Sequence, residues 1–272
     1  MDDLLSHRLD RLLVAFSHHV GLMLGDDRHR NLSRLLTAFA RIPYENLTKI
    51  IAVHERNSKI VKHSPEEVIA GFIAHGTGGT CFPLTLTLQR LVQALGYECF
   101  PILADRRYGV DTHCALICRC TPEGWHLIDP GYLITTPCPI VHHSSTRYTL
   151  PLTTIELRPL PTTNLVDLHT AIGSSPQDTD LKYRLTYKVT PVDEEDFNTA
   201  WDRSFEWEMM TYPIVSALKG DTQVYLQKSN LIVRSMNHSQ KTPLSDEEIV
   251  SELSRETPLS AHIVRRALGY LR

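Results

Sequence analysis

The sequence predicts an α+β protein in three parts: an N-terminal helical bundle over residues 1–96, a central β-barrel over residues 97–192 and a C-terminal α/β lid over residues 193–272. Three observations predict this division. Apolar residues recur at helical period through the first part, short strand-like runs separated by turns fill the second, and the third alternates between the two patterns. A series of short strands with turn signals is typical of a barrel or a strongly curved sheet.

The first part carries the spacing of amphipathic helices. Apolar side chains recur three or four positions apart in residues 12–20 and 32–40. Ser64, followed by a proline and two glutamates, is a typical N-cap, so a helix is expected to begin there. Apolar residues at helical spacing over 84–95 predict another helix with one buried face, and Gly96 is expected to end it.

After this helix the pattern changes to strands. Residues 98–103, 113–120, 125–128 and 181–189 are expected strands, and residues 121–124 are the expected hairpin turn between the second and the third. Polar stretches rich in Ser, Thr, Pro and His predict surface loops, and the rest of the chain predicts further elements: loops at 142–145 and 162–180, a helix over 193–210, a strand pair over 223–235, and final helices that begin at Ser245 and Ser260.

Composition excludes several classes of partner. The 272 residues are 42% hydrophobic and 22% charged, with a net charge of -3, which is ordinary for a globular protein and provides no basic footprint for nucleic acid or an anionic membrane. The acidic N-terminus lacks the features of a secretory signal, and no apolar run approaches the roughly 20 residues of a membrane span. We therefore expect a cytoplasmic protein with small-molecule partners, of undetermined oligomeric state.

The six cysteines are expected to be reduced thiols. Cys114, Cys118 and Cys120 lie close together, but strand alternation places all three on the face opposite His113. The chain also lacks a Cys-x-x-Cys pair, which most structural zinc sites use. The three cysteines are therefore predicted to be small packing residues, and no metal site is predicted.

Cys81 is the candidate nucleophile. It follows a glycine pair, in the segment Thr-Gly-Gly-Thr-Cys-Phe at residues 77–82, and begins the helical stretch. The unpaired N–H groups and the positive dipole end of a helix N-terminus favour a thiolate and lower the pKa of a cysteine. A cysteine after two glycines is nevertheless more often a packing residue than a nucleophile.

Two further residues complete a candidate triad. His113 begins one expected strand and Asp129 ends the next one, so the two can act as base and orienting carboxylate for Cys81. Alone, a strand histidine is usually structural, and an aspartate before Pro-Gly is usually a turn former. The assignment therefore depends on the three residues together.

At these residues the chain resembles the arylamine N-acetyltransferases. That family has a glycine pair before its cysteine, a Thr-His strand and a strand ending in Asp-x-Gly-aromatic, in this order. Residues 41–47, Arg-Ile-Pro-Tyr-Glu-Asn-Leu, and residues 95–97, Leu-Gly-Tyr, are similar to two more of its motifs. The resemblance covers most of residues 8–235 and is specific over residues 41–132. It implies a papain-like Cys-His-Asp arrangement and transfer of an acetyl group from acetyl-CoA, without a metal, to an arylamine through an acyl-cysteine.

The resemblance also implies binding residues and marks departures. Tyr132, Tyr44 and Phe82 are expected to contact the acceptor, and Gly131 and Thr112 are expected to contact coenzyme A. The chain departs from the family at four positions near the site. Thr77 stands where the family usually has an arginine, and Pro83, Thr85 and Leu133 also differ. The family's glycine at the position of Leu133 lets the backbone approach the pantetheine arm of coenzyme A.

Three functions of different classes therefore remain at this stage. The first is the acyltransferase with ping-pong kinetics. The second is a divergent cysteine enzyme on the same scaffold, an amide synthase or amide hydrolase that uses a donor other than acetyl-CoA. The third is a binding protein without activity, against which an intact set of Cys81, His113 and Asp129 argues, because packing alone does not require all three.

Overall fold

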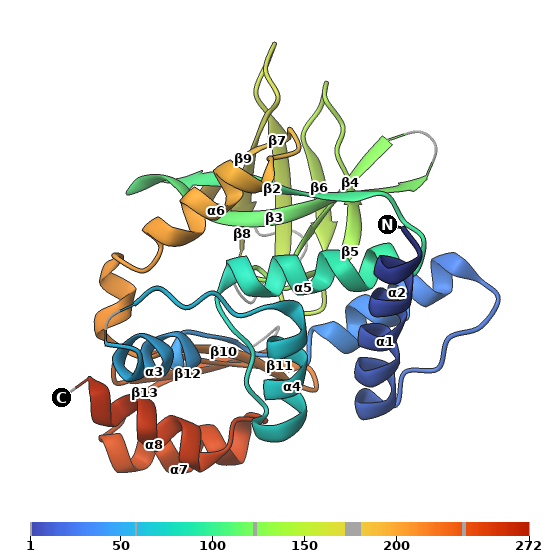
Figure 1. Cartoon of the computed structure of the whole chain (residues 1–272). Helices are drawn as coiled ribbons and strands as arrows, with labels where there is room; N and C mark the ends of the chain where they lie inside the picture. The colour runs from blue at the N-terminus through green and yellow to red at the C-terminus, as the bar shows by residue number, and fades with distance from the viewer. Residues whose placement is uncertain (1, 58, 122–123, 172–180, 236–237, 272) are drawn as a thin grey trace.

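The fold is α+β, with helices packed around two antiparallel sheets (Figure 1). The computed structural model describes residues 2–57, 59–121, 124–171, 181–235 and 238–271. Its central sheet is nearly closed and barrel-like, which confirms the predicted class. Among the described helices, none is long and apolar enough to cross a membrane.

The first third of the chain is mainly helical, as expected. Ser64 caps its helix through a capping box with Glu67, in which each side chain bonds the other residue's backbone N–H. Gly76 then ends that helix in the left-handed conformation that glycine adopts without strain. The helices are α1 (Asp2–Val20), α2 (Arg28–Phe39), α3 (Leu47–Glu55), α4 (Pro65–His75) and α5 (Cys81–Ala94).

The central sheet has eight antiparallel strands in the order β5-β4-β3-β2-β9-β8-β7-β6. The register pairs Ala104 with His113 and Leu116 with Ile128. In chain order the strands are β2 (Cys99–Arg106), β3 (Gly109–Thr121), β4 (Gly124–Asp129), β5 (Ile134–Pro139), β6 (Thr146–Thr149), β7 (Thr154–Pro159), β8 (Leu165–Thr170) and β9 (Lys182–Lys188).

The C-terminal part forms a second sheet with two helices. Its order is β1-β10-β11-β12-β13, so a short strand from the first part of the chain completes it. The elements are β1 (Tyr44–Glu45), α6 (Glu194–Arg203), the 3-10 helix η1 (Glu208–Thr211), β10 (Ile214–Lys219), β11 (Thr222–Gln227), β12 (Asn230–Ser235), β13 (His238–Pro243), α7 (Asp246–Glu256) and α8 (Ala261–Tyr270).

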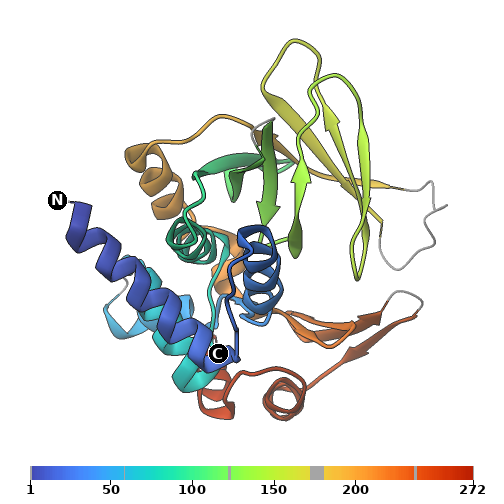
Figure 2. The same cartoon turned by 90° about the vertical axis from the view of Figure 1, so that its right-hand side faces the viewer.

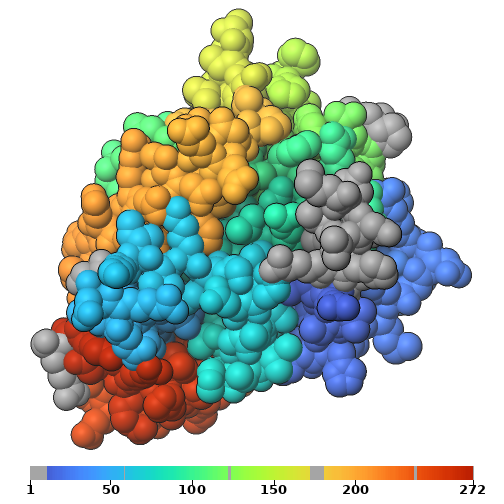
Figure 3. Space-filling view, in the orientation of Figure 1, coloured from blue at the N-terminus to red at the C-terminus, as the bar shows by residue number. Residues whose placement is uncertain are grey.

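Helix α5 lies between the two sheets and contacts β2 and β3 (Figures 1 and 2). One face of β2 to β4 packs with α1, α2, α4 and α5, and the other face lines the interior of the curved sheet. Helices α7 and α8 pack with α3 against β10 to β12. The space-filling view shows α6 (orange) above α3 and α4, and the C-terminal helices (red) below them (Figure 3).

Several element predictions are confirmed and others are corrected. The helices that begin after Ser64, Ser245 and Ser260 are present with those residues as N-caps. The expected loop over 162–180 is wrong in part, because β8 lies within it, and its remainder at 172–180 lies outside the described residues. The expected helix over 193–210 is two shorter helices, α6 and η1. The predicted turn at 121–124 includes residues outside the described part of the chain.

Candidate active site

The loop before Cys81 is held by close backbone packing. A Cβ at Gly78 would collide with the carbonyl oxygen of Pro43, so only glycine fits there. The buried carboxylate of Glu45 accepts from the backbone N–H of Gly78 at 3.1 Å, and also from the backbone N–H and the hydroxyl of Thr48. Glu45 therefore fixes this loop without the arginine that Thr77 replaces.

Cys81 is the first residue of α5, and its side chain is 0% exposed. The first N–H groups of a helix have no partner within the helix, and Pro83 contributes none, so the N–H groups of Cys81 and Phe82 are those nearest the thiol. Within the described residues, the buried hydroxyl of Thr80 has no hydrogen-bond partner either. The thiol thus lies at a positive, donor-rich position.

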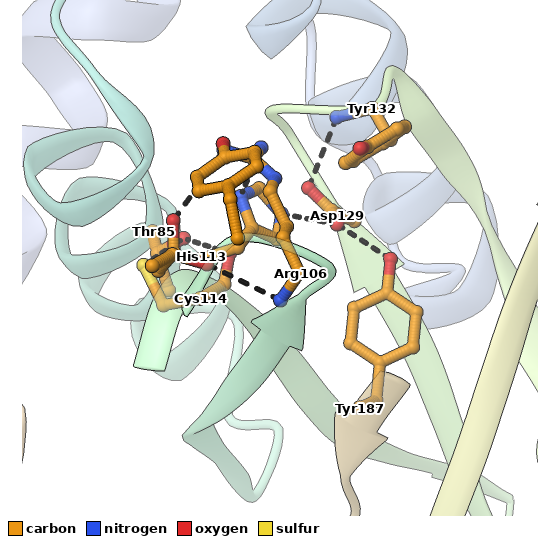
Figure 4. Close-up of polar contacts among 9 residues, drawn as sticks. Thr85, Arg106, His113, Cys114, Asp129, Tyr132 and Tyr187 are labelled. Carbon is orange, nitrogen blue, oxygen red and sulfur yellow. Dashed lines mark hydrogen bonds and ion pairs between the residues drawn. The ribbon is translucent and has the colours of Figure 1, made fainter. Parts of the chain in front are cut away.

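His113 and Asp129 are brought together by β3 and β4, and both are 0% exposed. Nε2 of His113 lies 2.7 Å from Oδ2 of Asp129 (Figure 4). The other ring nitrogen, Nδ1, lies 3.2 Å from Nη2 of Arg106, and Cys81 is close enough to His113 to raise the pKa of the imidazole. The structure therefore brings together the three residues that the sequence predicts as a triad.

Asp129 is held by two further donors. The hydroxyl of Tyr187, which lies on β9, donates to Oδ2 at 2.6 Å, and the backbone N–H of Tyr132 donates to Oδ1 at 3.0 Å (Figure 4). Both carboxylate oxygens are therefore occupied, which keeps Asp129 ionised and its orientation fixed. Sequence reasoning did not identify Tyr187, because β9 is distant in the chain and gives no local signal.

The pKa values of the triad are displaced in the directions that catalysis needs. A hydrogen bond from Cys114 holds the pKa of Cys81 well below its usual value; burial opposes this shift, and His113 adds to it. Burial would lower the pKa of His113, but the charge and hydrogen bond of Asp129 raise it. Burial would raise the pKa of Asp129, but the charge and hydrogen bond of His113 and the hydrogen bond of Tyr187 lower it. Together these shifts favour a thiolate and an imidazolium.

Cys114 has a more specific place than the predicted packing role. It is 0% exposed, lies in the same apolar cluster as Cys81 and lowers the pKa of that thiol. Thr85 lies beside it, with its Oγ1 3.5 Å from the Sγ of Cys114. The alternation argument separated Cys114 from His113 correctly, but it did not show that α5 places Cys81 within reach of both.

Arg106 is a second residue that the sequence did not reveal. Its Nη2 lies 3.2 Å from Nδ1 of His113, and its Nη1 donates to the hydroxyl of Tyr108 at 2.8 Å. It lies at the end of β2, on the hairpin that leads to β3. The hydroxyl of Thr112 fixes that hairpin by accepting from the backbone N–H of Arg106 at 3.2 Å.

The residues expected to bind the acceptor lie around the triad in different ways. The ring of Tyr132 stands edge-on to the ring of His113, with 5.2 Å between the two ring centroids. Tyr44 is half-buried and packs against the apolar cluster that contains Cys81. Phe82 is 0% exposed, and its ring stacks on the ring of Trp201 with 6.1 Å between the ring centroids. Tyr132 and Tyr44 thus border the triad, whereas Phe82 lies in the aromatic core behind it.

The residues expected to bind coenzyme A lie next to His113. A Cβ at Gly131 would be 2.8 Å from the ring of His113, so the glycine gives that ring its space. Leu133 has a φ of +56°, a conformation that is costly for a leucine and free for a glycine. The family's glycine at this position therefore has a backbone reason here, independent of coenzyme A. Contact of Gly131 or Thr112 with coenzyme A stays a prediction.

No group of three or more metal-binding side chains is present in the part of the chain that the structure describes. The cysteines of that part are all free and buried. The site described above thus consists of a thiol, an imidazole, a carboxylate and a guanidinium. These groups suit nucleophilic acyl transfer.

Comparison with known proteins supports this interpretation. A family model described as N-acetyltransferase matches residues 30–259. Comparison with curated protein sequences gives no significant match. Among solved structures, the arylamine N-acetyltransferase of Mycobacterium abscessus is 18% identical, with 95% of this chain and 94% of that chain covered and a TM-score of 0.78. The enzyme of Mycobacterium marinum is 16% identical, with 95% and 98% covered and a TM-score of 0.80.

A third solved structure bears on the triad. An arylamine N-acetyltransferase of Bacillus cereus, described as having a Cys-His-Glu catalytic triad, is 20% identical, with 92% of this chain and 98% of that chain covered and a TM-score of 0.73. The match of the family model over most of the chain, the shared fold and the buried Cys-His-Asp set lead to one conclusion. This chain is an acyltransferase that belongs to the arylamine N-acetyltransferase family.

Proposed function

We propose that this protein transfers an acetyl group from acetyl-CoA to an arylamine-type amine through an acetyl-Cys81 intermediate. The single observation that carries the proposal is the buried triad, in which Nε2 of His113 lies 2.7 Å from Oδ2 of Asp129, and Cys81 and His113 shift each other's pKa towards the ion pair. The family supports the acetyl donor, and one relative, the Mycobacterium marinum enzyme, is known in complex with CoA.

The first half of the reaction acylates the cysteine. The Cys81 thiolate attacks the thioester carbonyl, and the nearby backbone N–H groups at the start of α5 stabilise the oxyanion. The carbon–sulfur bond to coenzyme A then breaks, and the departing thiolate takes the proton from Nδ1 of His113. Acetyl-Cys81 and neutral His113 remain.

The second half transfers the acetyl group to the amine. The amine attacks acetyl-Cys81, and Nδ1 of neutral His113 takes the proton that the nitrogen loses. The tetrahedral intermediate expels Cys81 as a thiolate and releases the amide, which restores the thiolate and imidazolium pair. Asp129 keeps its charge throughout and stabilises the imidazolium.

Initial-rate kinetics with acetyl-CoA and an arylamine test this proposal. We expect parallel double-reciprocal lines, because the first product leaves before the amine enters. Cys81→Ser is expected to abolish turnover, whereas Cys138→Ser, a buried cysteine inside the curved sheet, serves as the matched control. Intersecting lines, or turnover retained in Cys81→Ser, would contradict the acyl-cysteine route.

A further inference from the structure

The side-chain hydroxyl of Thr80 is buried without a hydrogen-bond partner. Thr80 is 2% exposed, and its Oγ1 makes no hydrogen bond within the described part of the chain. Folded proteins rarely leave a buried hydroxyl in this state, because the group has lost its contacts with water and has gained no others. The hydroxyl therefore costs stability in the free protein, which calls for a functional explanation.

The sequence of α5 explains why this hydroxyl is unpaired. Thr80 is the N-cap of the helix, with the extended backbone of a capping residue at φ -78° and ψ -175°. A capping hydroxyl often accepts from the N–H of the third helical residue, as the hydroxyls of Ser64 and Ser245 do in α4 and α7. In α5 the third residue is Pro83, which has no N–H, and the side chain of Thr80 makes no capping bond at all.

This hydroxyl lies at the helix end that carries the nucleophile. The side chain of an N-cap residue lies against the open end of its helix, and here that end also holds the first N–H groups of α5, including that of Cys81. The backbone on both sides is fixed. The carbonyl of Gly79 accepts from the N–H of Glu45 at 2.9 Å, and the carbonyl of Thr80 accepts from the N–H of Leu84 at 3.2 Å. Thr80 therefore offers a donor whose position is set before any substrate binds.

We propose that Thr80 is a catalytic residue whose hydroxyl donates a hydrogen bond to the oxyanion that forms when Cys81 attacks the acyl donor. As Sγ of Cys81 bonds to the thioester carbon, an electron pair of the C=O bond moves onto the oxygen, and Thr80 donates to that oxygen without giving up its proton. When the carbon–sulfur bond to coenzyme A breaks, the pair returns and the carbonyl of acetyl-Cys81 forms.

The benefit of this hydrogen bond arises in the transition state. The oxygen of the thioester is uncharged, and the oxygen of the tetrahedral intermediate is an anion, so the hydrogen bond strengthens as the reaction proceeds and lowers the barrier. The inference deepens the proposed function and rests on the acyl transfer to Cys81 that it contains.

Two reagents for Cys81 distinguish this role from a general effect on the thiolate. Iodoacetamide alkylates the thiolate by displacement at a saturated carbon, so no oxyanion forms, whereas 4-nitrophenyl acetate acylates it through a tetrahedral oxyanion. We expect the rate of acylation relative to that of alkylation to fall on the order of 100-fold in Thr80→Val, which keeps the shape of the side chain and removes only the hydroxyl. Thr80→Ser retains a hydroxyl and should keep the ratio near that of the wild type.

Thr87→Val is the matched control. Thr87 is a fully buried threonine of the same helix, but its hydroxyl already donates to the carbonyl of Pro83 at 2.7 Å. Removal of that hydroxyl should leave the ratio unchanged. Cys81→Ala measures the reaction of the ester elsewhere on the protein, which is subtracted.

Thermal unfolding separates the catalytic role from a structural one. Removal of an unpaired buried hydroxyl should leave the melting temperature of Thr80→Val unchanged or raise it. An unchanged ratio, or equal slowing of both reactions together with a lower melting temperature, overturns the inference. If 4-nitrophenyl acetate acylates Cys81 and acetyl-CoA does not, the donor in the proposed function is wrong instead, and the ratio still reports on Thr80.

Discussion

At the residue scale, the reactivity of Cys81 depends on neighbours that come from separate strands. His113 and Cys114 are consecutive on β3, and both lower the pKa of the thiol, because α5, which begins at Cys81, packs against this strand. Asp129 acts on the thiol indirectly, because it hydrogen-bonds to the imidazole of His113, and Tyr187 in turn donates a hydrogen bond to Asp129. The environment, rather than the cysteine alone, makes the thiolate.

The pH dependence of alkylation tests this environment. Because the pKa of Cys81 is lowered, its thiolate is present above that folded-state pKa and is lost only as the pH falls through it. We expect the midpoint of the rate of reaction with iodoacetamide to lie well below the usual value of about 8.5, and to move up towards it in His113→Gln. His126→Gln, on the adjacent strand, should leave the profile unchanged. Identical profiles for wild type and His113→Gln would contradict the ion pair.

Leu133 provides a stability prediction. Its φ of +56° costs a branched residue about 1 kcal/mol or more, and glycine removes this cost. We expect Leu133→Gly to leave the free energy of unfolding unchanged or to raise it by up to about 1 kcal/mol. Leu165→Gly, a half-buried strand residue, should lower it. Denaturant unfolding measures both variants, and equal destabilisation would show that Leu133 is not strained.

The sequence predicted the triad but not its surroundings, for a physical reason. Cys81, His113 and Asp129 belong to local motifs whose residue types and order are visible in the chain. Arg106 and Tyr187 have no such motif, since their proximity to His113 and Asp129 depends on the register of β2 with β3 and on the pairing of β2 with β9. Register of this kind is a property of the folded sheet.

At the element scale, the pattern of burial explains which strands could be predicted. The middle of β3 is buried on both faces and holds the apolar run of residues 114–118, whereas β13 is almost entirely exposed and has no apolar signal. β8 alternates between buried and half-buried residues, but it lies between polar stretches that resemble loops. Exposed or interrupted strands therefore escaped prediction, and so did β7 and β10, although most of their residues are buried.

A buried lysine on helix α3 leads us to predict how the stability of the protein changes with pH. Lys49 is 5% exposed and donates to the carbonyl and the hydroxyl of Ser204, and burial lowers its pKa to about 7. The unfolded chain holds this proton to higher pH, so stability should rise between pH 7 and 9, by about 2 kcal/mol. Thermal unfolding of Lys49→Met should show a smaller rise. Lys241→Met, at an exposed position, is the control and should keep the full rise; the same result for Lys49→Met would contradict the lowered pKa.

At the scale of the whole molecule, the first part of the chain is joined to the last. β1 pairs with β10, and Leu47 and Ile51 of α3 share a core with α7 and α8. The loop before Cys81 also packs on β1, through Glu45 and the bridge between Tyr44 and Gly79. The division of the chain at residues 96 and 192 stays a prediction. Residues of the first and last parts pack together to support the loop before Cys81.

This connection predicts that the C-terminal core supports the active site. Val264 of α8 is 0% exposed, and a carboxylate there would be buried without compensation, at a cost of several kcal/mol. We expect Val264→Asp to unfold at a lower temperature and to lose the fast alkylation of Cys81. His262→Asp places the same residue on the exposed face of α8 and should do neither. Retained fast alkylation in a destabilised Val264→Asp would show that the active site does not depend on this core.

The central claim of this account is that Cys81 carries the acyl group. Incubation of the purified protein with acetyl-CoA alone, followed by measurement of the intact mass, tests it most directly. We predict a gain of one acetyl group that is absent in Cys81→Ala and present in Cys138→Ser. No gain in the wild-type protein, or the same gain in Cys81→Ala, would contradict the account.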